Sequence, residues 1–166
     1  MNLLNMKRAL MLKTIFRNPL ESVLCVLISA LSIVTFSQVV ARYIFQAPLS
    51  WSEELARFLL LWLAKLSAAY AFKIKAHFAL HFMVNTVPRK MQKIISLFAS
   101  LLVIFFLVGF VYHSFKFVIG VKGHLAPALQ IPMEIPYSAC IVGSMLMLFY
   151  VLKTFIKDIN SKSPME

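Results

Sequence analysis

Four long apolar runs constrain the fold of this chain more than any other feature of its sequence. They cover about residues 20–45, 52–72, 94–119 and 135–155, and each has roughly 20 residues or more. An α-helix of that length crosses a hydrocarbon core of about 30 Å and satisfies its own backbone hydrogen bonds there. The sequence therefore predicts an all-α integral membrane protein, a bundle of four tilted transmembrane helices.

The composition excludes an ordinary soluble domain. Of the 166 residues, 61% are hydrophobic and 14% are charged, and the mean hydropathy is +0.83. In a soluble protein, a net charge of +11 would indicate nucleic acid as a partner. Here the basic residues lie in short segments between the apolar runs, without the basic–aromatic pattern of a nucleic-acid module. We expect them to set the topology and to attract anionic lipid headgroups of the bilayer, with no nucleic-acid partner.

The lysines and arginines fall mainly on one side of the predicted membrane. Three of them, Arg42, Lys116 and Lys122, belong to the other side. Twelve lie in the N-terminal segment, in residues 73–93 or near the C-terminus, namely Lys7, Arg8, Lys13, Arg17, Lys73, Lys75, Arg89, Lys90, Lys93, Lys153, Lys157 and Lys162. Because loops rich in Lys and Arg stay in the cytoplasm, we expect both termini and segment 73–93 to be cytoplasmic.

This topology divides the chain into three parts. Residues 1–19 form a basic cytoplasmic or interfacial segment, which either lies on the membrane as a helix or only fixes the orientation. Residues 20–155 form the four-helix membrane domain, and residues 156–166 form a cytoplasmic tail. The link at residues 120–136 contains three prolines and is predicted to face the outside.

The second apolar run carries charged residues, although most of the run is apolar enough to lie in a bilayer. Glu53 and Glu54 open it, Arg57 follows one turn later, and Lys65 lies deeper. At 100° per residue these side chains fall within roughly one third of the helix circumference, and both carboxylates are spaced to pair with Arg57. A charged stripe inside a membrane is costly unless it faces protein or water, so we interpret it as a partner interface. A simpler interpretation is that the glutamates only complement the helix dipole.

The chain shows no set of residues for catalysis or for a cofactor. Two adjacent glutamates beside an arginine favour ionised carboxylates rather than a general acid, so we predict that the chain is not an enzyme. His77 and His81 have the spacing of two metal ligands, but no third ligand lies near, and solvated interfacial histidines are the favoured interpretation. Two alternative functions stay open. A membrane anchor of a redox enzyme would need histidines facing each other across the helices, and a small homodimeric exporter would need a carboxylate deep in the membrane.

Three stretches resemble the small membrane subunit of tripartite ATP-independent periplasmic (TRAP) transporters. Residues 51–62, WSEELARFLLLW, look like the family's W-x-E-E-x-x-R segment with its second tryptophan. Residues 68–71, AAYA, lead to His77 as the family's small-residue run leads to a basic turn and a histidine. Residues 127–132, PALQIP, resemble the outer-loop L-x-I-P. Lys65 departs from the family, which usually has an apolar residue there.

The resemblance implies a role, a location and partners. Such a subunit scaffolds a large membrane subunit of about twelve helices and helps to dock a periplasmic substrate-binding protein. The expected process is sodium-coupled uptake of an organic acid, such as a dicarboxylate or a sialic acid, across the bacterial inner membrane. No cofactor is expected in this chain, because sodium would bind to the large subunit.

The charged stripe and the resemblance together single out individual residues. The expected partner interface or structural charge cluster consists of Trp51, Glu53, Glu54, Arg57, Trp62 and Lys65. The expected docking residues of the outer loop are His124, Pro127, Leu129, Ile131 and Pro132. His77 belongs to the expected cytoplasmic turn.

Overall fold

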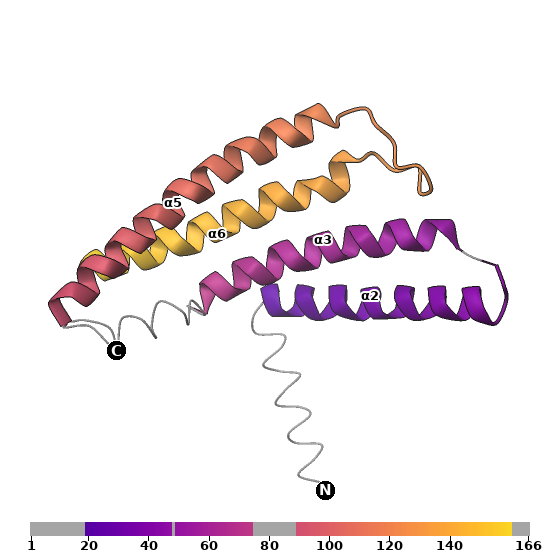
Figure 1. Cartoon of the computed structure of the whole chain (residues 1–166), viewed down its shortest axis with the longest axis horizontal. Coiled ribbons are helices and arrows are strands. Elements are labelled where there is room, and N and C mark those ends of the chain that lie inside the picture. The colour runs from indigo at the N-terminus through magenta and orange to yellow at the C-terminus, as the bar shows by residue number, and fades with distance from the viewer. Residues whose placement is uncertain (1–18, 48, 75–88, 161–166) are drawn as a thin grey trace, which may run out of the picture.

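The computed structural model describes residues 19–47, 49–74 and 89–160. They form four α-helices, which are α2 (Pro19–Tyr43), α3 (Ser50–Lys73), α5 (Arg89–Gly120) and α6 (Glu134–Asn160) (Figure 1). Each helix is long and apolar enough to cross a membrane. Within the described ranges the only β-structure is an isolated bridge between Leu125 and Pro132. The predicted fold class, an all-α protein with four membrane-spanning helices, is confirmed.

The helix boundaries follow local signals in the sequence. Pro19 is the first residue of α2, a position where its missing N–H costs nothing. At the start of α3 the Ser52 hydroxyl donates a hydrogen bond to the carbonyl oxygen of Leu49 at 2.7 Å. Helix α5 begins at Arg89, ahead of the predicted span, and its apolar part runs from Leu97 to Gly120. The chain then turns at Gly123, whose φ of +83° favours glycine.

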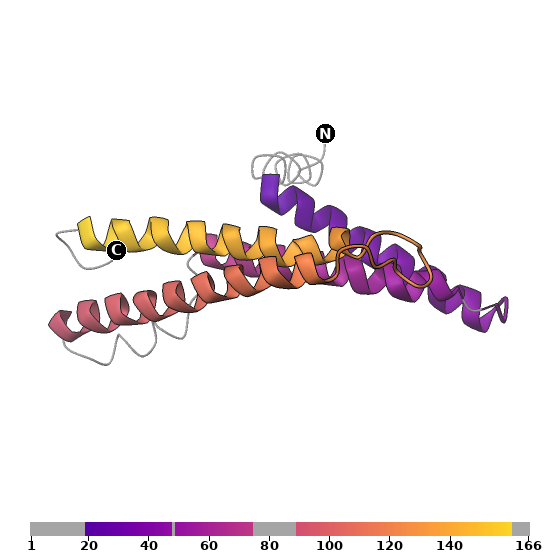
Figure 2. The same ribbon diagram turned by 90° about the horizontal axis from the view of Figure 1, so that it is seen from above.

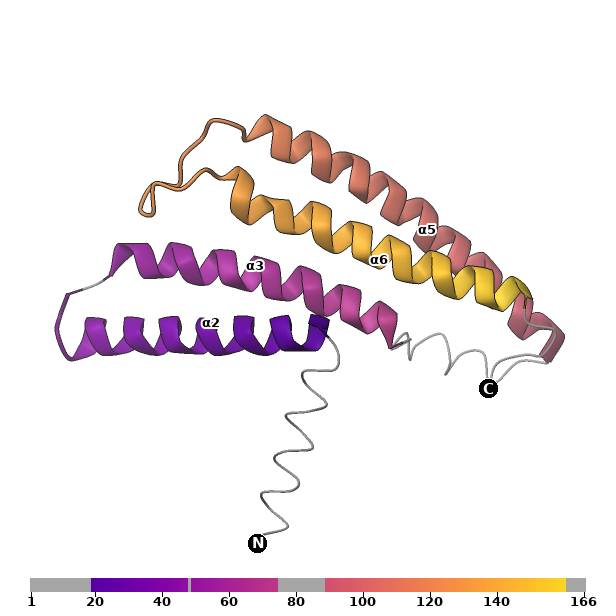
Figure 3. The same ribbon diagram turned by 180° about the vertical axis from the view of Figure 1, so that it is seen from behind.

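The four tilted helices pack side by side as an open layer. Helix α3 packs against α2 on one side and against α6 on the other, and α5 packs against α6 (Figures 1 and 3). Among the described helices, no other pair comes into backbone contact. Helices α2 and α5 therefore lie at opposite edges of the layer and do not meet. An open layer leaves broad apolar faces for lipid or for partner helices.

Small residues of α6 allow it to approach α3 closely. A Cβ atom added at Gly143 would lie 2.6 Å from the Cβ of Lys65. Ala139 and Ser144, on the same part of α6, are almost completely buried. Further along the helices, the apolar core consists of Ala69, Leu107, Met147 and Val151. Close packing through small residues is the usual source of helix association in a membrane, where apolar side chains gain little by leaving lipid.

The connections between helices lie as four successive spans require. The α2–α3 link (residues 44–49) and the outer loop (residues 121–133) lie towards the same end of the layer (Figures 1 and 2). The start of α2, the end of α3, the start of α5 and the end of α6 lie towards the other end. Which end faces the cytoplasm stays a prediction from the charge distribution. The predicted N-terminal interfacial segment up to residue 18, His77 and the tail from residue 161 lie outside the described residues.

Candidate functional site

Glu54 connects α3 to the outer loop. Its Oε2 atom accepts hydrogen bonds from the backbone N–H groups of Ala128, at 2.9 Å, and Leu129, at 2.8 Å. Hydrogen bonds to an ionised carboxylate are stronger than those between neutral groups. The contact therefore joins two features that were predicted separately, the charged stripe of the second span and the docking loop.

The outer loop is a small hairpin with internal hydrogen bonds. The Ala126 N–H donates to the Ile131 carbonyl at 2.9 Å, and the Gln130 N–H donates to the Ala126 carbonyl at 2.9 Å. Gln130 has a φ of +54°, and its side-chain amide donates to the Pro127 carbonyl at 3.0 Å. Ala126 is completely buried, whereas Pro127 and Ala128 are exposed. The tip is thus a folded turn that presents a few side chains outward.

Glu53, the residue before Glu54, faces α2 instead of the outer loop. Its Oε1 atom accepts a hydrogen bond from the Gln38 Nε2 atom at 3.3 Å. At the far end of the same helix pair, the Tyr70 hydroxyl donates to Glu21 Oε1 at 2.9 Å. One side-chain hydrogen bond therefore joins α2 to α3 near each end of the pair. The signal in the sequence is the presence of polar residues within apolar runs, but the pairing depends on the helix arrangement.

The predicted ion pairs between Arg57 and the two glutamates are not formed. Arg57 is exposed, and within the described part of the chain it makes no ion pair or hydrogen bond. Glu53 shares a face of α3 with Arg57 but accepts a hydrogen bond from Gln38 of α2. Glu54 points about 100° away from Glu53, towards the outer loop. Gln38 and the loop amides bind these carboxylates, and the guanidinium has no partner in the part of the chain that the structure describes.

The predicted stripe is also divided at Lys65. This residue lies against α6 beside Gly143, and its Nζ atom is 4.6 Å from the centroid of the Phe110 ring on α5. An ammonium over an aromatic face is a cation–π contact, so Lys65 has a partner within its own chain. Residues 57 and 65 differ by about 80° around the helix, enough to separate an exposed site from a site between helices.

One side of α3 stays uncovered along most of its length, and we call it the α3 free face. It consists of Glu53, Arg57, Leu60, Ala64 and Ser67, all of which are exposed. Because these residues are alternately four and three positions apart, their side chains line up along one side of the helix as a single seam. Within this seam, Arg57 is the one cation, about 10 Å from the helix start at Ser50.

The other predicted interface and docking residues lie in several environments. Trp51 is exposed and Trp62 is partly buried, so the two tryptophans of the motif are not equivalent. In the outer loop, His124, Pro127 and Pro132 are exposed, whereas Leu129 and Ile131 are partly buried. The exposed three are available for contact, and the other two contribute backbone groups that hold the loop together.

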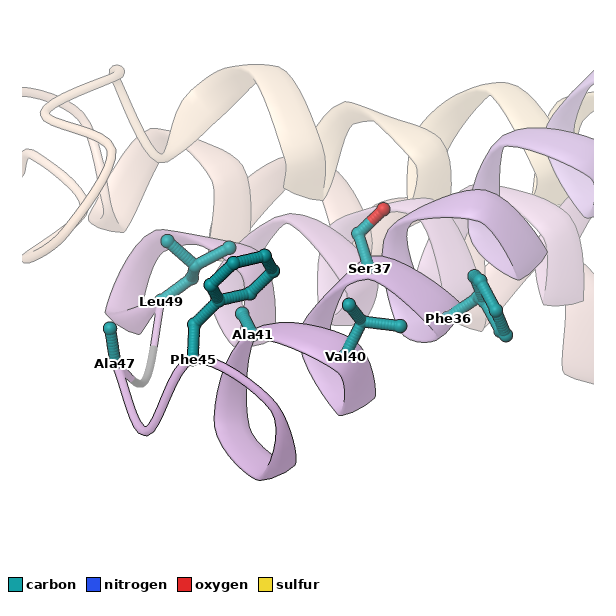
Figure 4. A pocket seen from close by; sticks show the side chains of 7 residues that line it. All are labelled: Phe36, Ser37, Val40, Ala41, Phe45, Ala47 and Leu49. Atoms are coloured by element: carbon teal, nitrogen blue, oxygen red, sulfur yellow. The ribbon is translucent and has the colours of Figure 1, made fainter.

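Metal and ligand sites need particular groupings of side chains. No group of three or more His, Cys, Asp or Glu side chains in these ranges is placed to hold a metal ion. A hollow beside the α2–α3 link is open to the surface and lacks a charged group (Figure 4). Its lining residues are Phe36, Ser37, Val40, Ala41, Phe45, Ala47 and Leu49. Such a lining suits apolar contact but would not bind an organic acid.

Residues 31–161, which include about half of α2 and all of α3, α5 and α6, match the family model described as tripartite ATP-independent periplasmic transporters, DctQ component. The chain belongs to this family. It is a small permease subunit of a TRAP transporter, which is a transport component rather than an enzyme. The predicted family resemblance is confirmed, and the redox-anchor and exporter alternatives are set aside. Family membership and the four apolar helices together indicate a multi-pass inner-membrane protein.

Individual relatives agree with this assignment. A Haemophilus influenzae protein named as a TRAP transporter small permease is 30% identical over 146 residues, which is 87% of this chain and 90% of that protein. The ectoine TRAP transporter small permease protein TeaB of Halomonas elongata is 29% identical over 134 residues, 77% of this chain and 67% of TeaB. The sialic acid TRAP transporter permease protein SiaT of Haemophilus influenzae is 30% identical over 83 residues, 50% of this chain but 14% of SiaT. In SiaT, a segment similar to this chain is thus part of a much longer permease.

Proposed function

We propose that this chain is the scaffold of a TRAP permease, holding the large membrane subunit through the α3 free face. The observation that carries this proposal is Arg57, an exposed cation that is unpaired within the described residues. An unpaired guanidinium inside a membrane costs a few kcal/mol on insertion scales. A carboxylate or backbone carbonyl groups from a partner helix would offset that cost, and Leu60, Ala64 and Ser67 would let the helix approach closely.

The similarity to SiaT supports a permanent association with a larger membrane partner. A segment like this chain occurs there within a much longer permease polypeptide. Permanent association fits an open layer with wide apolar faces, because a partner would cover one of them. The scaffold would then hold the static part of the large subunit while the sodium-coupled transport part moves.

The outer loop would contribute to docking of the periplasmic substrate-binding protein. It lies at the end of the layer that the charge distribution assigns to the outside. Its exposed residues His124, Pro127 and Pro132 are available for contact. We expect only part of the docking energy to come from this loop, because the large subunit presents its own outer surface.

The substrate would be an organic acid taken up with sodium. The names of relatives mention sialic acid, a C4-dicarboxylate and ectoine, and each of these compounds carries at least one carboxyl group. The diversity of these names supports a substrate class but does not select one compound. This fits a division of labour in which the large subunit holds the substrate and sodium sites.

Reconstitution tests the proposal. The large subunit, this chain and the cognate binding protein are placed in liposomes with a sodium gradient, and uptake of radiolabelled organic acid is measured with and without this chain. We expect uptake to require all three components. Undiminished uptake without this chain would contradict the scaffold role. Undiminished uptake and docking after residues 124–130 are replaced by a neutral linker would contradict the docking role alone.

A further inference from the structure

The tip of the outer loop has two backbone donors that depend on another helix. Pro127 has no N–H, and the Gln130 N–H is satisfied within the loop by the Ala126 carbonyl. The Ala128 and Leu129 N–H groups between them both donate to one oxygen of Glu54. Two successive amides that donate to one carboxylate oxygen restrict the position of the tip, because both hydrogen bonds must keep a favourable distance and angle at the same time.

Glu54 lies on a firmly held part of the molecule. Helix α3 packs between α2 and α6, and Ser52 and Phe58 on either side of Glu54 are buried. The outer loop itself joins α5 to α6, the other half of the layer. The two hydrogen bonds to Glu54 join the tip of this loop to α3. The carboxylate thus fixes the tip relative to the centre of the layer.

We propose that Glu54 is a positioning residue that fixes the shape of the outer loop, and that this shape sets the affinity of the permease for the periplasmic binding protein. The second half of this statement rests on the proposed docking function. The first half concerns this chain alone and stands on the two hydrogen bonds.

Glu53 separates this role from a general effect of negative charge at a helix start. Both glutamates carry a negative charge near the N-terminal end of α3, where Glu53 belongs to the first turn and Glu54 follows it directly. Glu53, however, accepts a hydrogen bond from Gln38 and none from the loop. A Glu53→Ala variant therefore removes the same charge from the same helix end while leaving the loop contact in place.

Amide hydrogen exchange of the permease complex tests the positioning role. The exchange rates at Ala128 and Leu129 are compared in the unaltered complex and in Glu54→Ala, Glu54→Gln and Glu53→Ala variants. A charge-assisted hydrogen bond is worth about one decade or more in an equilibrium constant, so we expect about tenfold faster exchange in Glu54→Ala. Glu54→Gln, which keeps an acceptor oxygen without the charge, should give an intermediate rate, and Glu53→Ala should change little. Equal exchange at both amides in all four proteins would overturn the proposal.

The docking consequence is measured separately. Uptake in proteoliposomes is recorded against the concentration of substrate-loaded binding protein. We expect Glu54→Ala to raise the half-saturating concentration several-fold while the maximal rate stays within about twofold, with Glu54→Gln in between. Faster exchange with an unchanged half-saturating concentration would overturn the docking half of this proposal, whereas the docking function itself fails only if replacement of residues 124–130 also leaves docking unchanged. A fall in maximal rate alone would assign Glu54 to the carrier cycle and would also overturn the docking half.

Discussion

Neighbouring charged residues at the start of α3 have different partners. This difference accounts for most of the contacts in the candidate site. Glu53 bonds to α2, Glu54 bonds to the outer loop, and Arg57 is left free for a partner outside the described chain. The cause is geometric, because a rotation of 100° per residue moves adjacent side chains into different environments of a helix layer. The charged residues look continuous on a helical projection, but Glu53 faces α2 and Glu54 faces the outer loop.

Replacement of Arg57 should weaken assembly. Loss of a charged contact at a buried interface costs about 2–5 kcal/mol, so Arg57→Ala should reduce the large subunit that co-purifies by about tenfold or more under stringent washing. Arg57→Lys keeps the charge but loses the bidentate geometry, and should fall between. The control is Lys65→Leu, which removes a cation that already has the Phe110 ring as its partner. Full retention of the large subunit by Arg57→Ala would mean that the guanidinium only reaches the membrane surface.

A methyl group at Gly143 should destabilise the fold. The new Cβ would meet the Lys65 Cβ at 2.6 Å and the Lys65 backbone at 3.2 Å, so α3 and α6 would have to separate. Overpacking of this kind costs about 1–3 kcal/mol. We expect Gly143→Ala to lower the melting temperature in detergent. Gly109→Ala is the matched control, since a Cβ at Gly109 has no neighbour within 4 Å. Equal melting temperatures of the two variants would contradict the close approach.

At the residue scale, sequence periodicity placed four charged residues in one sector of a helix but did not predict their partners. It singled out Glu53, Glu54, Arg57 and Lys65, but assigned ion pairs within one helix. The actual partners, Gln38, the amides of residues 128 and 129, and the Phe110 ring, lie on other elements. Contacts between distant segments depend on the order of helices in the layer, which local spacing does not encode.

At the scale of elements, the helices themselves were predictable because lipid leaves the backbone few choices. Long apolar runs must satisfy their own hydrogen bonds, and the four helices result from that requirement. Which helices pack against each other was harder to predict from the sequence. All four helices carry apolar residues on several sides, so no single hydrophobic face indicates the neighbour. The small residues Ala139, Gly143 and Ser144 mark the α3–α6 contact only once the helices are aligned.

Removal of the Tyr70 hydroxyl should loosen the α2–α3 pair. The hydroxyl donates to Glu21 at 2.9 Å, and a side-chain hydrogen bond between membrane helices contributes about 0.6 kcal/mol on average. Tyr70→Phe should therefore lower the free energy of unfolding in mixed detergent by about that amount, up to roughly 1.5 kcal/mol. Tyr112→Phe serves as the control, because Tyr112 is exposed and its hydroxyl makes no hydrogen bond within the described residues. Equal losses in both variants would show that the Glu21 contact contributes nothing.

At the scale of the whole molecule, the open layer explains why the chain works as a subunit. Its core is narrow, and large side chains such as Phe105, Phe36 and Val26 are exposed on its faces. Lipid can cover such faces, but Arg57 on the α3 free face calls for a polar partner. A closed four-helix bundle would hide these faces, and the order of the spans along the chain does not distinguish such a bundle from a layer.

The orientation of the layer follows from charge and has a direct test. In a background with Cys25 and Cys140 replaced by alanine, single cysteines are introduced as His124→Cys and Lys90→Cys. A membrane-impermeant maleimide added to intact cells should label position 124 and leave position 90 unlabelled until the membrane is permeabilised. The reverse pattern would invert the topology and remove the outer loop from the side of the binding protein.

The most direct test of the scaffold account is photo-crosslinking from the α3 free face. A benzophenone amino acid is placed at Leu60, which is 54% exposed, or as a control at Leu66, which is 6% exposed and faces the inside of the layer. Both variants are co-expressed with the large subunit and irradiated in membranes. The account predicts a crosslinked product of this chain with the large subunit from position 60 and only unlinked or internally linked chain from position 66. Absence of that product at position 60, with the complex intact, would contradict the central claim that α3 holds the large subunit.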